Sequence, residues 1–229
     1  MVHGRVSPGG PGFVVPVAPT SWLVASTYLR LGVEHILLGF DHLLFVLGLL
    51  LLSRSLGALV RTVTAFTAAH SVTLALAALG VLHVAQAPAE AAIALSIVFV
   101  AREIAAGDAR FPTLAARRPW VVAALFGLIH GLGFAGALAA IGLPAGEVPL
   151  ALAAFNAGVE LGQLGFVVAV LVAAWALLAA AAALRRRGDR AAPSLSAVAA
   201  GPVRVALGYG IGVLATALCI GRVAIILRP

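Results

Sequence analysis

Long apolar stretches separated by short polar connections dominate the chain from about residue 32 onward. Several exceed about 18 residues with few or no charges, the length that an α-helix needs to cross a hydrocarbon core of about 30 Å. Helices are the expected spanning element, because each one satisfies its own backbone polar groups. The pattern therefore predicts an all-α, polytopic membrane protein with six transmembrane helices in one bundle, over residues 32–52, 59–82, 89–107, 120–143, 149–184 and 203–227.

The same pattern predicts the domain organisation. Residues 1–30 form a Gly- and Pro-rich leader, with a short interfacial helix around 21–31, and residues 31–229 form a single transmembrane domain with a cytoplasmic linker over 185–202. The fifth stretch, at 36 residues, is about 54 Å long if straight, so it must tilt, kink or project from the bilayer. Gly158, Gly162 and Gly165 are the expected positions for a bend.

Composition and charge fix the class and the orientation. Hydrophobic residues make up 62% of the chain and charged residues 10%, against roughly half and a quarter in soluble proteins. All 15 basic residues are arginines, and ten of them lie in or beside the first, third and fifth connections, while residues 83–88 and 144–148 contain none. The positive-inside rule then puts both termini outside the bacterial inner membrane. The net charge of +7 is explained by arginines that set the orientation of the protein and contact the anionic lipids of the bilayer. It does not indicate binding of nucleic acid.

Many polar side chains nevertheless lie inside these apolar stretches, where an ionisable group is costly and usually has a partner or a function. Eleven of them are candidates for a site: Glu34, His35, Asp41, His42, His70, Ser71, Glu103, His130, Asn156, Glu160 and Gln163. Asp41, His42, His70, His130 and Glu160 all fall eight to twelve residues into their stretches, near the bilayer midplane.

Imidazole and carboxylate groups together suit Ni²⁺, Co²⁺, Zn²⁺, Cu²⁺ or iron. We therefore expect a metal site with the ligands His35, Asp41, His42, His70, His130 and Glu160. His35 and His42 are seven residues apart and share one helix face, and Gly39 between them could let the helix deform. Side chains expected to support these ligands are Glu34, Ser71, Glu103, Asn156 and Gln163. Some of these side chains could instead have structural roles. Asn156 and Gln163 could form hydrogen bonds between helices, and Glu103 could form an ion pair with an arginine.

The segment from Glu34 to Phe45 reads EHILLGFDHLLF and resembles the H-P-x-x-G-x-D-H signature of the HupE/UreJ family, with Ile36 in place of the proline. The segments FTAAHS, GLIHGLGF and FNAGVELGQ, which contain His70, His130 and Glu160, resemble its later blocks. The resemblance implies a hydrogenase or urease accessory protein that moves Ni²⁺, and also Co²⁺, into the cell. It maps the signature onto His35, Gly39, Asp41 and His42.

Three functions fit these residues. A permease with a midplane His and carboxylate site is the leading hypothesis, so a transporter is favoured over an enzyme. An intramembrane hydrolase is the alternative, in which three histidines and an aspartate hold a Zn²⁺ that activates water. Ser71 and Glu103 are its only candidates for an assisting group. A metal-binding accessory protein without transport is the third.

Overall fold

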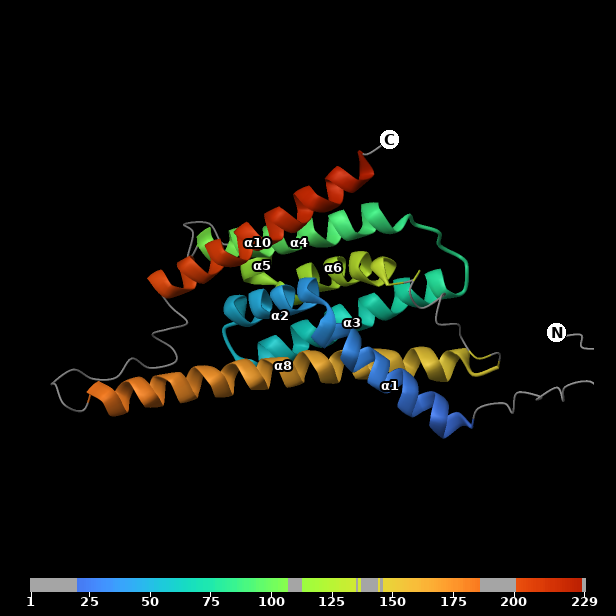
Figure 1. The fold of residues 1–229 in the computed structure, drawn as a ribbon, viewed down its shortest axis with the longest axis horizontal. Helices are drawn as coiled ribbons and strands as arrows, with labels where there is room; N and C mark the ends of the chain where they lie inside the picture. Colours follow the sequence, from blue (N-terminus) through green and yellow to red (C-terminus); the bar gives the residue numbers. More distant parts are fainter. Residues whose placement is uncertain are drawn as a thin grey trace, which may run out of the picture.

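The computed structural model describes residues 20–106, 113–134, 136, 144, 146–185 and 201–227. Within these ranges every regular element is a helix (Figure 1): α1 (Ser21–Leu38), α2 (Phe40–Leu52), α3 (Leu56–Ala78), α4 (Gln86–Ala106), α5 (Leu114–Arg117), α6 (Pro119–Gly133), α8 (Val148–Arg185) and α10 (Pro202–Ile226). The predicted all-α class is therefore confirmed. The predicted leader up to residue 19, most of the linker and the end of the fourth stretch lie outside the described residues.

The first predicted span is not one straight helix. It is divided at Gly39 into α1 and α2, whose axes differ by 76°. Gly39 has extended backbone angles, φ −81° and ψ 96°, and its N–H still donates to the His35 carbonyl at 3.0 Å. The predicted interfacial segment at 21–31 is the first part of α1, which begins where the Thr20 hydroxyl accepts a hydrogen bond from the Leu23 N–H. The helix therefore does deform at Gly39, and the expectation that His35 and His42 share one helix face is wrong.

Three described helices are long and apolar enough to cross a membrane, namely α3, α8 and α10, and the bent pair α1–α2 makes a fourth if it counts as one span. α4 has 21 residues but includes Glu90, Arg102 and Glu103, and α6 has only 15 residues. The structure thus supports three or four spans. The 38-residue α8 is unbroken, so its glycines do not interrupt it.

Glycines instead allow three helix pairs to approach closely. A Cβ atom on Gly158 of α8 would collide with the Leu29 carbonyl of α1. On α6, a Cβ at Gly127 would collide with the Phe66 backbone of α3, and one at Gly131 with the His70 carbonyl of the same helix. Gly208 of α10 lies similarly close to Ile104 of α4. Small residues let helix backbones pack tightly in lipid, where van der Waals contact replaces the hydrophobic effect.

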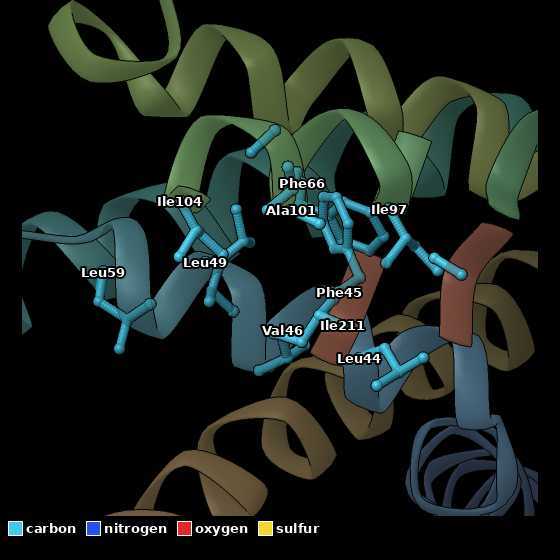
Figure 2. Packing of buried hydrophobic residues seen from close by; sticks show 14 of the residues in the cluster. Leu44, Phe45, Val46, Leu49, Leu59, Phe66, Ile97, Ala101, Ile104 and Ile211 are labelled. Carbon is cyan, nitrogen blue, oxygen red and sulfur yellow. The ribbon is translucent and has the colours of Figure 1, made fainter. Parts of the chain in front are cut away.

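α2 lies inside the bundle, because its side chains are shared between α3 and α4. Phe45 and Leu49 of α2 pack with Phe66 of α3 and with Ile97 and Ile104 of α4 (Figure 2). A second cluster joins α1, α3 and α8 through Ile36, Leu74 and Phe155. The bend at Gly39 therefore directs α2, and with it His42, into the centre of the protein.

Candidate metal site

Four histidines from four helices meet where the two apolar clusters adjoin, and they are called here the imidazole cluster: His35, His42, His70 and His130. The ring centroids of His35 and His42 are 4.5 Å apart, those of His42 and His130 are 5.4 Å apart, and those of His35 and His70 are 6.2 Å apart. His42, His70 and His130 are buried, at 8%, 0% and 1% exposure, and His35 is half-buried.

The local folding of the chain explains how these rings meet. His35 is in the last turn of α1 and His42 is in the first turn of α2. The 76° bend between them brings their rings together even though they are not on one helix face. A Cβ atom at Gly39 would lie 2.6 Å from His42 Nδ1 and 2.7 Å from the His35 carbonyl oxygen. Only glycine fits there without a shift, so Gly39 permits the contact between the two rings.

The helices α3 and α6, which carry His70 and His130, pack backbone to backbone. The carbonyl of His70 lies against Gly131, the residue that follows His130. His130 Nδ1 is 2.8 Å from the Phe126 carbonyl oxygen. A carbonyl can only accept, so Nδ1 carries the hydrogen and Nε2 keeps a lone pair in the neutral ring. This is the tautomer that a metal-binding histidine needs when its second nitrogen is held by the backbone.

Most ring nitrogens of the cluster have no hydrogen-bond partner among the residues that the structure describes. The unpartnered buried atoms include His35 Nε2, both nitrogens of His42, both nitrogens of His70, and His130 Nε2. A buried polar atom left unpaired costs about 1–3 kcal/mol. Six such atoms in one region are unusual in a native core.

Phenylalanines surround the imidazoles. Phe134 lies 4.0 Å from the His35 ring, Phe45 and Phe66 each lie 5.0 Å from the His130 ring, and Phe155 lies 5.6 Å from the His35 ring, all between centroids. They leave the rings in a largely apolar surrounding, in which electrostatic interactions are strong. All four phenylalanines stand in the sequence segments quoted above, but the pattern of polar residues does not mark them.

One of the two carboxylates predicted as ligands has another partner. Glu160 accepts a hydrogen bond from the Thr64 hydroxyl at 2.5 Å. Asp41 is half-buried and lies near Arg222 and Glu90, which form an ion pair of 2.7 Å between α10 and α4. Among the residues that the structure describes, no three His, Cys, Asp or Glu side chains are arranged to hold a metal ion.

The side chains expected to support the ligands form contacts outside the imidazole cluster. Glu34 pairs with Arg30 at 2.7 Å, and Glu103 pairs with Arg102 at 2.7 Å and also accepts from Thr113. The Ser71 hydroxyl donates to the Thr67 carbonyl at 2.7 Å, and Asn156 Nδ2 donates to the Leu152 carbonyl at 2.8 Å. Gln163 Oε1 accepts from the Thr67 hydroxyl at 3.0 Å, one turn from His70.

Comparison with known proteins identifies one family. A family model described as HupE / UreJ protein matches residues 15–205, which include the whole imidazole cluster and end within α10. No curated protein and no solved structure matches the chain.

Proposed function

We propose that the chain, which belongs to the HupE / UreJ family, binds a divalent transition-metal ion in the imidazole cluster and carries it across the inner membrane. Ni²⁺ is the expected cargo and Co²⁺ the next, in keeping with the nickel or cobalt role that the family suggests. Imidazole nitrogens also bind Zn²⁺ and Cu²⁺. Selection among these ions must therefore depend on the coordination geometry of the site and on which metal ions are available in the cell.

The set of six unpartnered ring nitrogens carries this proposal. An ion bound by imidazoles sits about 2.0–2.1 Å from each nitrogen, which puts it about 3.2 Å from each ring centre. Rings on one ion therefore have centroids no more than about 6.5 Å apart. The pairs His35–His42, His42–His130 and His35–His70, at 4.5 Å, 5.4 Å and 6.2 Å, each satisfy this limit, so the two rings of each pair can bind the same ion.

Binding would require the rings to turn, since no three of the described side chains are yet arranged to hold an ion. His42 has the freedom for this, because neither of its nitrogens is hydrogen-bonded to any residue that the structure describes. His130 is held through Nδ1 and would be the fixed member of the set. A site of neutral imidazoles would leave the ion its full charge, which favours release over permanent retention.

The hydrolase alternative has less support. Water activation at a metal needs an adjacent base. The two candidates for that role are engaged elsewhere, Ser71 with the Thr67 carbonyl and Glu103 with Arg102 and Thr113. A metal-binding accessory protein without transport would have the same cluster and is separated from a permease only by measuring flux.

The proposal includes a six-span topology with both termini outside, in which α4 and α6 cross the membrane within the bundle. The arginine distribution supports it. With Cys219 replaced by alanine, a single cysteine at position 188 should react with a membrane-impermeant maleimide only from the cytoplasmic side. Reaction from the outside of intact cells would show that the protein has the opposite orientation.

Metal binding can be tested directly on the full chain in lipid nanodiscs. Equilibrium dialysis followed by elemental analysis should find about one or two Ni²⁺ ions per chain, and His70→Ala or His130→Ala should abolish this binding. His83→Ala is the matched control, because His83 is exposed outside the helices and should bind as the parent does. Equal binding by all three variants would rule out the imidazole cluster, and uptake of radioactive nickel into proteoliposomes would then test transport itself.

A further inference from the structure

A groove of about 660 Å³ runs along the outer side of the α4–α10 pair, away from the imidazole cluster. Its walls include Val98 and Ala101 of α4 and Gly212, Val213 and Ile220 of α10. The lining is apolar except for Arg102, Tyr209 and Thr216. Much of the lining consists of small residues, among them Ala105, Gly208, Gly212 and Ala217.

The groove has the length of one membrane leaflet. The two helices are antiparallel, since Gly208 lies against Ile104 and Gly212 against Ala101. On α10 the lining extends from Gly208 to Ile220. The helix rises about 18 Å over this range. Half of a hydrocarbon core of about 30 Å is about 15 Å. One acyl chain of a phospholipid therefore matches the groove from the headgroup level to the bilayer midplane.

A fixed positive charge lies at the headgroup end of the groove. Arg102, one turn before the end of α4, has a side chain that is 67% exposed, and its Nη1 donates to Glu103 Oε1 at 2.7 Å. The Glu103 side chain is only 4% exposed and is held on its other oxygen by Thr113. A guanidinium has five N–H donors in a rigid fork, so the bond to Glu103 orients Arg102 and leaves donors free for an anion.

Two further features support a lipid at this end. Tyr209 lines the same stretch of groove and is 65% exposed, as expected of an aromatic residue at the membrane interface. Arg117 and Arg118, at the α5–α6 junction, mark the end expected to face the cytoplasm. Anionic lipids give the cytoplasmic leaflet a negative surface potential, and basic pockets between helices on that side bind their headgroups.

We propose that this groove is a binding site for an anionic phospholipid, with one acyl chain between α4 and α10 and its phosphate on Arg102. In this site Glu103 is a positioning residue, which explains why a carboxylate is buried near the end of α4. The site is separate from the imidazole cluster, and its test does not depend on metal binding.

Native mass spectrometry of the full chain, released from nanodiscs with equal phosphatidylglycerol and phosphatidylcholine, measures which lipid is retained. The parent should prefer phosphatidylglycerol by about fivefold, the effect expected of one arginine near an anionic surface. Arg102→Gln should remove the preference, and Arg102→Lys should restore most of it and show that the fold tolerates the position. Arg30→Gln is the matched control, because Arg30 also pairs with a glutamate at 2.7 Å but does not line the groove, so it should retain the preference.

The apolar part of the site has its own pair of variants. Ala217→Phe should fill the groove and reduce retention of both lipids, whereas Ala206→Phe, at an exposed position of α10 outside the groove lining, should have no effect. An unchanged phosphatidylglycerol preference in Arg102→Gln would overturn the proposal. So would a parent dimer that Ala217→Phe dissociates without changing lipid retention, because a second copy would then occupy the groove.

Discussion

Replacing Gly39 by alanine is expected to disturb the junction between α1 and α2 and to weaken metal binding. The backbone angles, φ −81° and ψ 96°, are open to alanine, so the whole cost comes from contacts. The new Cβ would lie 2.6 Å from His42 Nδ1 and 2.7 Å from the His35 carbonyl oxygen. Rotation of the His42 ring relieves the first contact. The second involves backbone whose oxygen already accepts the Gly39 N–H at 3.0 Å, so the bend itself must open.

Overpacking of this kind costs about 1–3 kcal/mol. A displaced His42 should also weaken metal affinity by about 10- to 100-fold, the range seen when the supports of a ligand are lost. Thermal unfolding in nanodiscs and competition with a chromophoric chelator measure the two effects. Gly165→Ala is the matched control, since a Cβ there would meet nothing within 4 Å. If Gly39→Ala matches Gly165→Ala in both measurements, the bend does not set the position of His42 and the reasoning is wrong.

Two further substitutions test the surroundings of the cluster. Thr67→Val keeps the shape but removes the 3.0 Å hydrogen bond to Gln163. It should lower the free energy of unfolding by about 1 kcal/mol, measured by steric trapping in bicelles, and no loss would show that the bond is not a stabilising link between α3 and α8. Asp41→Asn should reduce nickel uptake more than Glu34→Gln, because Glu34 is 41% exposed and paired with Arg30, whereas Asp41 adjoins His42. The reverse order, at equal protein abundance, would put the important carboxylate at Glu34.

The helical class and the meeting of the histidines could be predicted from the sequence because each depends on a local pattern. Apolar length indicates a membrane helix, and polar residues at similar depth in several helices must lie at one level of a bundle. This reasoning selected His42, His70 and His130 from different helices, and the structure brings their rings together with that of His35.

The size of the bend at Gly39, and the position that it gives to His42, could not be predicted from the sequence. Both depend on the packing of α1 against α8 and of α2 against α4. The sequence shows a glycine between two histidines, but either a straight or a broken helix is compatible with it. The placement of Glu160 also depends on a tertiary contact, because Thr64 of α3, which donates a hydrogen bond to it, is far from it in the chain. The phenylalanines were missed because an aromatic residue in an apolar helix has no distinctive spacing.

X-ray absorption spectroscopy of the nickel-loaded chain in nanodiscs tests the central claim most directly, because it reports the atoms bound to the ion. An ion bound in the imidazole cluster should have mainly nitrogen ligands and should show the multiple scattering typical of imidazole rings. This scattering should be reduced in His70→Ala and unchanged in His83→Ala. A shell of oxygen atoms without imidazole scattering would contradict it, and the ion would then have to be bound by carboxylates outside the imidazole cluster.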